Sequence, residues 1–241
     1  MNQFFRIITC VALSHFFASV VLAKESIQVV TENWYPYNYL DDNHKVVGQS
    51  TERVLQVLNT AKVDFTLALY PWTRALNLAT TQPNVLLYTV LRTPDREDLF
   101  HWVCPVAKKR VHQLYRLTER TDIKIKSEQD VKNYSVVVTR DTFLHQYMQD
   151  LGLSDGHNLH LTADDDVNAT LFLAGRVDVL PAFDSAISRI LAAKGLDSSY
   201  ISPLMTIPAK HYPDYCMALS LSTPLELIEK IRQANKTITT Y

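Results

Sequence analysis

The stretch VLLYTVLRTPDR, residues 85–96, carries the main fold signal of the chain. Residues 85–90 form an almost unbroken run of apolar and strand-forming residues, a pattern typical of a strand buried on both faces of a parallel sheet. Pro94 follows shortly after the run and Arg96 two residues later. Ligands of parallel sheets bind beyond the carboxyl ends of the strands. The stretch therefore predicts a buried strand with Arg96 near a binding crevice.

Predicted strands and helices alternate on both sides of this stretch. Apolar patterns, capping residues and prolines define the elements. The predicted strands are 26–31, 63–69, 85–90, 102–106, 111–117, 135–139, 159–162, 177–180 and 215–219, and the predicted helices are 51–59, 71–78, 142–151, 164–174, 185–193 and 224–235. This order predicts an α/β protein with mostly parallel sheets flanked by helices.

Composition excludes several classes of function. The chain has 241 residues, 24 Lys plus Arg and 25 Asp plus Glu, so its formal net charge of −1 gives no electrostatic basis for binding nucleic acid. Its five Gly never form a phosphate-binding loop. His157 and His160 lack further close ligands, which makes a poor zinc site. We therefore expect neither a metal nor a cofactor.

The N-terminus has the pattern of a secretory signal. An apolar stretch over residues 7–23 ends in small residues before Lys24, which predicts a signal peptide over residues 1–23, cleaved after Ala23, and a periplasmic product. Cys104 and Cys216 then remain, an even number in an oxidising compartment. They form either one disulfide or two buried free thiols.

Aromatic and charged residues follow three of the predicted strands. Aromatic faces hold flat or cationic groups, and arginine binds carboxylates through two parallel hydrogen bonds. The three clusters together favour a binding cleft, whereas each aromatic alone is explained as well by packing, and Arg74 by pairing with a surface acid. The candidate residues in these clusters are Glu32, Trp34, Tyr37, Trp72, Arg74 and Arg96.

The order of motifs resembles a known family. The motifs are Trp34-Tyr35-Pro36-Tyr37, Tyr70-Pro71-Trp72-Thr73-Arg74-Ala75, Leu91-Arg92-Thr93-Pro94-Asp95-Arg96-Glu97 and Leu173-Ala174-Gly175-Arg176-Val177-Asp178. Together they are similar to a divergent branch of the family 3 periplasmic solute-binding proteins, the amino-acid-binding type of ABC transport systems. The resemblance implies a type II periplasmic binding protein fold with two α/β lobes and two hinge crossovers.

The resemblance also implies the limits of the lobes and the place of the cysteines. Lobe 1 would comprise residues 24–106 plus 208–241, and lobe 2 would comprise residues 107–207. Cys104 and Cys216 would both lie in lobe 1 near the crossovers, where a disulfide between them is worth testing.

Carried over by motif, the resemblance assigns roles to single residues. Arg96 would bind the ligand carboxylate, Thr89 would contact the ligand, and Trp34 would cover its side chain. Thr142 would help a helix N-terminus hold the carboxylate, and Asp184, with a shift of one residue, would bind the ammonium group. The pattern departs at Asp141, where the family usually has Gly, and a carboxylate there would oppose a ligand carboxylate.

We therefore expect a periplasmic monomer that captures a small polar solute, an amino acid or a related carboxylate, by hinge closure. It would deliver the solute to an inner-membrane ABC permease or to a sensor receptor, without catalysis, a cofactor or nucleic acid. The alternative is a periplasmic enzyme on the same fold, acting like a dehydratase on a small carboxylate. Glu32 or Asp184 would then be its acid–base group.

Overall fold

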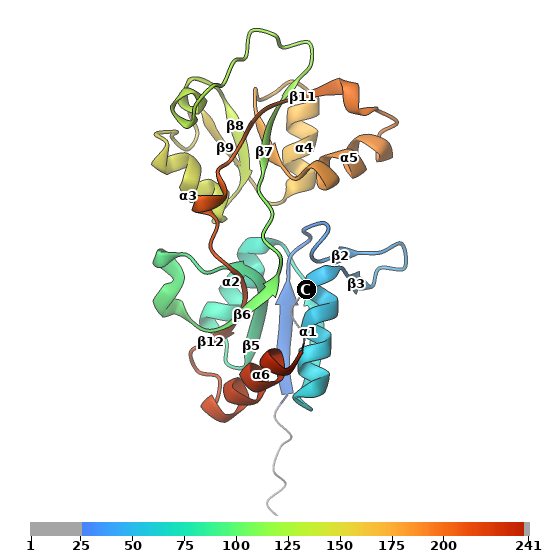
Figure 1. The fold of residues 1–241 in the computed structure, drawn as a ribbon, viewed down its shortest axis with the longest axis vertical. Coiled ribbons are helices and arrows are strands. Elements are labelled where there is room, and N and C mark those ends of the chain that lie inside the picture. Colours follow the sequence, from blue (N-terminus) through green and yellow to red (C-terminus); the bar gives the residue numbers. More distant parts are fainter. Residues whose placement is uncertain (1–25, 239–241) are drawn as a thin grey trace, which may run out of the picture.

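The structure is a computed structural model that describes residues 26–238, and it consists of two lobes joined by two chain segments (Figure 1). The predicted signal peptide, residues 1–23, lies outside the described residues. Within residues 26–238, no helix has the length and apolar character needed to cross a membrane.

Lobe 1 is built on a five-stranded sheet whose order is β4-β1-β5-β12-β6. β1 pairs in parallel with both β4 and β5, while β12 runs antiparallel between β5 and β6. The bounds are β1 Ser26–Thr31, β4 Asp64–Leu69, β5 Val85–Leu91, β6 Phe100–Ala107 and β12 Tyr215–Ser220. Every residue of β5 is buried, as its apolar run predicts.

Three helices cover the two faces of this sheet. Leu86 and Tyr88 of β5 pack in one core with apolar residues of α1, Gln49–Thr60, and α6, Leu225–Thr237. Leu87 and Val90 pack in a second core with α2, Trp72–Thr81. Because side chains alternate across a strand, β5 supplies both cores.

Lobe 2 combines two smaller sheets. β8, Val136–Thr139, and β9, Leu159–Thr162, pair in parallel. β7, Gln113–Leu117, lies between β10, Leu180–Ala182, and β11, Ile201–Thr206, and pairs antiparallel with both. A parallel bridge between Val136 and Val179 links the two sheets.

Three helices flank the sheets of lobe 2, namely α3 Phe143–Asp150, α4 Asp165–Leu173 and α5 Asp184–Ala193. Thr142 and Asp164 cap α3 and α4, because each side chain accepts a hydrogen bond from a backbone amide in the first turn. The shorter elements are β2 Tyr39–Leu40, β3 Val46–Val47 and 3₁₀ helices at Pro94–Leu99, Glu128–Asn133, Ser198–Tyr200 and Ala209–His211.

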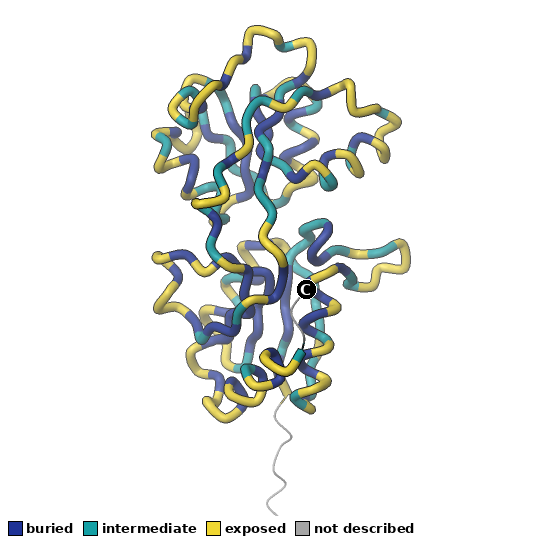
Figure 2. The backbone as a smooth tube through the Cα atoms, viewed as in Figure 1, coloured by how far each residue is buried: buried dark blue, intermediate teal, exposed yellow. Residues whose placement is uncertain are grey.

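The two segments between the lobes are bonded to each other. One leads from β6 into β7 and the other from β11 into β12 (Figure 1). The backbone amide of Ile207 donates to the carbonyl of His112 at 2.9 Å. Figure 2 shows buried residues along the sheets of both lobes and more accessible residues in the connections between them.

A disulfide joins Cys104 of β6 to Cys216 of β12, with the two Cα atoms 4.4 Å apart. β6 and β12 are neighbouring strands of the lobe 1 sheet, so the bond lies within that lobe. Of the two alternatives for these cysteines, the structure shows the disulfide. It also confirms the predicted two-lobed α/β class, and the residue limits of the lobes stay a prediction.

Candidate functional site

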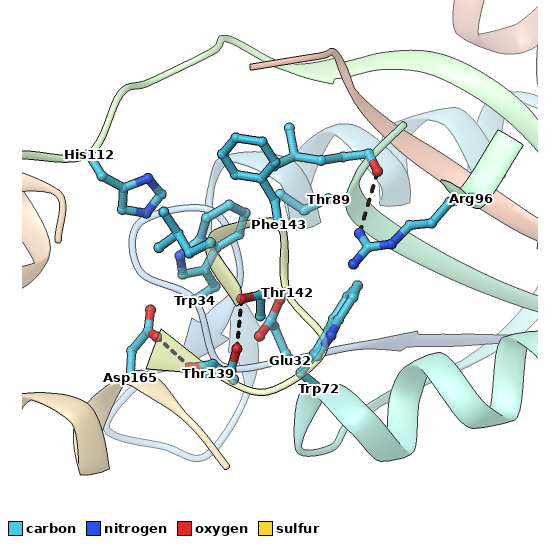
Figure 3. Close-up of a pocket in the computed structure, with 12 residues that line it drawn as sticks. Glu32, Trp34, Trp72, Thr89, Arg96, His112, Thr139, Thr142, Phe143 and Asp165 are labelled. Atoms are coloured by element: carbon cyan, nitrogen blue, oxygen red, sulfur yellow. Dashed lines mark hydrogen bonds between the residues drawn. The ribbon is translucent and has the colours of Figure 1, made fainter. Parts of the chain in front are cut away.

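A cavity lies between the two lobes (Figure 3). Lobe 1 contributes residues from the carboxyl ends of β1 and β5, from the segments that follow them and from the N-terminus of α2, and lobe 2 contributes residues around the N-termini of α3 and α4. His112 comes from the first crossover. The lining residues are Glu32, Trp34, Trp72, Thr89, Leu91, Arg96, His112, Thr139, Thr142, Phe143, Leu144 and Asp165.

Thr89 reaches the cavity because of an irregularity in β5. β12 pairs Cys216 with Val90 and Met217 with Tyr88, which leaves Thr89 as the extra residue of a bulge. Thr89 has φ 63°, a left-handed conformation that β-branched residues rarely adopt. It is 3% exposed, and its hydroxyl has no hydrogen-bond partner among the described residues. A buried, unpaired hydroxyl at a strained position lines the cavity.

Unlike the Thr89 hydroxyl, the guanidinium of Arg96 contacts several groups of the protein. The residue is 7% exposed and lies in the short helix after β5. Its guanidinium stacks over the Trp72 ring, with Cζ 5.2 Å from the ring centroid. Nη2 donates to the backbone carbonyl of Asp141 at 2.7 Å, and Nη1 lies 3.5 Å from the carbonyl of Leu91. A fixed positive charge therefore borders the cavity.

Glu32 brings a carboxyl group that is protonated near neutral pH. It directly follows β1, and its backbone carbonyl accepts a hydrogen bond from the Asn38 side chain. Loss of hydration and the nearby Asp165 carboxylate raise the pKa of Glu32 to about 8, and Arg96 opposes this rise only in part. An arriving cation would favour ionised Glu32.

Asp165 brings a second carboxyl group, from the first turn of α4. Its side chain accepts hydrogen bonds from Thr139 Oγ1 at 2.7 Å and from Asn168 Nδ2 at 3.1 Å. Asp165 keeps accessible surface because it borders the cleft. Loss of hydration between the lobes raises the pKa of this carboxyl group.

Aromatic side chains form walls of the cavity. The Trp34 ring lies 5.4 Å from the Phe183 ring of lobe 2 and 5.1 Å from the Tyr37 ring of lobe 1. His112 is neutral, since burial lowers its pKa to about 3. The cavity thus combines one guanidinium, two carboxyl groups and flat apolar surfaces, a set that suits a small solute carrying both charges.

Hydrogen bonds to a single backbone carbonyl join the lobes beside the cavity. The Asp141 carbonyl of lobe 2 accepts from Trp72 Nε1 at 2.8 Å and from Arg96 Nη2, both of lobe 1. Asp141 has φ 58°, a left-handed conformation that aspartate tolerates better than most residues. Asp141 borders a separate outer hollow with Thr73, and it is absent from the lining of the central cavity.

The structure brings six of the predicted site residues together at the cavity, and three lie elsewhere. Asp184 accepts a hydrogen bond from the Tyr115 hydroxyl. Arg74 stacks over Tyr70, with Cζ 4.4 Å from the ring centroid. Tyr37 is buried in the core and donates to the backbone carbonyl of Lys108 at 2.8 Å. The six at the cavity are Glu32, Trp34, Trp72, Thr89, Arg96 and Thr142.

Sequence reasoning missed other lining residues. Asp165 lies in the acidic first turn of a helix, a common arrangement that by itself gives no sign of a cavity. In the sequence, Phe143 and Leu144 have the pattern of ordinary apolar residues of a helix. His112 lies in a crossover, and only the packing of the two lobes brings it to the cavity. Its aromatic surroundings, Trp34 and Phe183, are distant in sequence.

No group of three or more His, Cys, Asp or Glu side chains in residues 26–238 is arranged to hold a metal ion. No protein-family model matches the chain, and no curated protein matches it significantly by sequence.

Solved structures nevertheless share its fold. A histidine kinase sensor domain with similarity to periplasmic binding proteins superposes with a TM-score of 0.74 at 18% identity, covering 88% of this chain and 89% of the other. An ancestral arginine-binding protein bound to arginine gives 0.71 at 15% identity, covering 88% and 91%. The arginine-, lysine-, histidine-binding protein ArtJ from Geobacillus stearothermophilus gives 0.72 at 16% identity, covering 88% and 89%. The chain has the two-lobed fold of these binding proteins.

Proposed function

We propose that this chain, which has the fold of periplasmic amino-acid-binding proteins, is exported and captures a small solute bearing both a carboxylate and an amine. The observation that carries the proposal is the cavity between the lobes, which is lined by Arg96 and by the acidic residues Glu32 and Asp165. An amino acid or a closely related carboxylate has this distribution of charge.

Each end of such a solute has a complementary group. Arg96 would hold the carboxylate, supported by the unpaired Thr89 hydroxyl and the N-terminus of α3 at Thr142. Glu32 and Asp165 would hold the amine, and its positive charge would lower the raised pKa of both carboxyl groups. Trp34 and Trp72 would cover the apolar part.

The magnitudes are consistent with useful affinity. A dissociation constant of 1 μM corresponds to about −8 kcal/mol, and a hydrogen bond to a charged group contributes roughly 1.5–3 kcal/mol. Two such contacts with burial of the apolar part reach this range. Closure of residues 24–106 plus 208–241 onto residues 107–207 would exclude water, and the closed protein would present the solute to a permease or a sensor receptor. The histidine kinase sensor domain, which has the same fold, supports a role in signalling through a sensor receptor.

A thermal-shift panel tests the proposal. The panel compares L-amino acids with carboxylates that lack an amine and with amines that lack a carboxylate. A binder at about 100 times its dissociation constant stabilises the folded state by about 2.7 kcal/mol. We expect stabilisation by at least one amino acid and little by the single-charge compounds. A panel without any stabilising compound would contradict the proposal.

An enzyme on this fold remains the competing function, because Glu32 has the raised pKa that general acid–base catalysis requires. Asp184, the other acid considered for that role, lies outside the cavity and is bonded to Tyr115. Recovery of the bound solute unchanged after prolonged incubation is expected for a binding protein, and its conversion would favour the enzyme.

A further inference from the structure

His112 connects the two crossovers at the edge of the cavity. It lies just before β7, is 3% exposed and accepts a backbone hydrogen bond from Ile207 of the second crossover. Its ring stacks on Phe183, with the centroids 4.1 Å apart, and on Tyr212, with the centroids 5.7 Å apart. These contacts hold the plane of the imidazole ring.

The Tyr212 hydroxyl determines which ring nitrogen carries the proton. It accepts a hydrogen bond from the His112 backbone amide at 3.1 Å and lies 2.7 Å from His112 Nδ1. A hydroxyl has one proton to donate, and Nδ1 is the only acceptor for it among the described residues. The hydroxyl therefore donates to Nδ1, and the proton of the neutral ring is on Nε2.

Of the two ring nitrogens, the Tyr212 hydroxyl bonds only Nδ1, and the second, Nε2, has a different environment. No described residue forms a hydrogen bond with Nε2, and unlike the Thr89 hydroxyl it is not fully buried. His112 lines the cavity beside Trp34 (Figure 3). An N–H group at the cavity wall that no described residue engages is available to an acceptor that enters the cavity. The bound solute is the partner that the cavity can supply.

We propose that His112 is a ligand-binding residue whose Nε2–H donates a hydrogen bond to an acceptor oxygen of the solute, and that Tyr212 is the positioning residue that fixes this tautomer. The inference rests on the proposed function, because the solute supplies the acceptor. A donor placed in a crossover would also connect occupancy of the cavity with the segments on which the lobes move.

Nuclear magnetic resonance of the ¹⁵N-labelled protein reads the tautomer directly. Two-bond ¹H–¹⁵N correlations of His112 are recorded from pH 5 to 8 for the protein and for Tyr212→Phe. We expect a neutral ring with the proton on Nε2 throughout this range, because burial lowers the pKa of His112 to about 3. Loss of the hydroxyl in Tyr212→Phe should introduce the Nδ1–H tautomer. A proton on Nδ1 in the unmodified protein, or titration near the usual pKa, would overturn the assignment.

Binding measurements test the donor itself, with the most stabilising amino acid of the thermal-shift panel as the probe. His112→Phe keeps a stacking ring without a donor, whereas His112→Gln keeps an N–H group near the position of Nε2. We expect at least a tenfold higher dissociation constant for His112→Phe and a smaller increase for His112→Gln. Binding by His112→Phe as tight as that of the unmodified protein overturns this inference alone. If no amino acid binds the unmodified protein, the proposed function fails and this inference with it.

Discussion

Thr89 has a strained backbone conformation, and no contact among the described residues explains it. A β-branched residue in a left-handed conformation costs about 1–3 kcal/mol, and the buried hydroxyl of this cavity-lining residue has no partner among the described residues. Strain of this kind is often retained where a side chain has a task. We interpret Thr89 as a contact for the solute.

Thr89→Gly should therefore raise the stability of the protein and weaken its binding of the solute. Gly adopts φ 63° without the steric penalty, so we expect the free energy of unfolding to rise by about 1 kcal/mol. The lost hydroxyl should weaken binding of the panel amino acid about threefold or more. Chemical denaturation and calorimetric titration measure the two effects. Thr89→Ser is the matched control, since it keeps the hydroxyl, and it should bind normally. Unaltered binding by Thr89→Gly would contradict a ligand contact at Thr89.

Glu32 makes the stability of the ligand-free protein depend on pH. Its folded-state pKa is raised to about 8 from an ordinary value of 4.5, so between these values the folded state holds a proton that the unfolded state has lost. Stability contributed in this way falls as pH rises, by at most about 1.4 kcal/mol per pH unit. His112 has a lowered pKa and acts in the opposite direction, but only below about 6.5.

The window from pH 6.5 to 8 therefore excludes the contribution of His112, and comparison with Glu32→Gln separates the contribution of Glu32 from that of Asp165, whose pKa is also raised. We expect the melting temperature of the ligand-free protein to fall across this window and that of Glu32→Gln to change less. Differential scanning calorimetry at half-unit steps gives both curves. Parallel curves for the two proteins would show that the carboxyl group of Glu32 titrates at its ordinary pKa.

At the scale of elements, the N-terminus of α2 and the turn before α3 join the two lobes. Trp72 and Arg96 of lobe 1 both donate to the Asp141 carbonyl of lobe 2, and the left-handed conformation of Asp141 places that carbonyl between them. The backbone of Asp141, rather than its carboxylate, makes this contact. Asp141 is absent from the lining of the cavity, although the charge of its carboxylate still acts on Arg96.

Trp72→Phe should shift the lobes toward an open arrangement. It removes the Nε1 donor and keeps an aromatic wall at the cavity. A hydrogen bond of this kind contributes about 0.5–1.5 kcal/mol, so we expect roughly a threefold to tenfold higher dissociation constant. Small-angle X-ray scattering should show a larger radius of gyration without ligand.

Trp102→Phe is the matched control for this variant. It also removes an indole donor to a backbone carbonyl, that of Glu97 at 2.9 Å, but within lobe 1. It should lower stability without changing the radius of gyration or the affinity. Equal effects of both variants would show that the Trp72 contact has no special part in closure.

At the scale of the whole molecule, the element order was predictable because strands and helices have strong local patterns. The apolar run of β5 and the capped start of α4 appear in the structure close to their predicted bounds. β11 was missed because its segment, ISPLMT, contains a proline and lacks clean alternation. The β2–β3 pair is too short to leave a periodic signal.

The site was less predictable, because its residues meet only when the lobes pack. Glu32 directly follows β1 and Arg96 lies in the short helix after β5, so both could be placed at one sheet edge from the sequence. Asp184 was expected at the cavity from a motif that fits with a shift of one residue, and in the structure Tyr115 binds its carboxylate instead. His112 depends on Tyr212, one hundred residues away in sequence. Local patterns carry no information on such a pair.

The most direct test of the account is isothermal titration calorimetry of the purified protein and of Arg96→Lys with the most stabilising amino acid of the panel. We predict one site per chain with a dissociation constant near 1 μM, or about −8 kcal/mol. Arg96→Lys keeps the charge but loses the planar guanidinium that stacks on Trp72 and matches a carboxylate, so its affinity should fall at least tenfold. Absence of binding by the unmodified protein, or equal affinity of the two proteins, would contradict capture of an amino acid at Arg96.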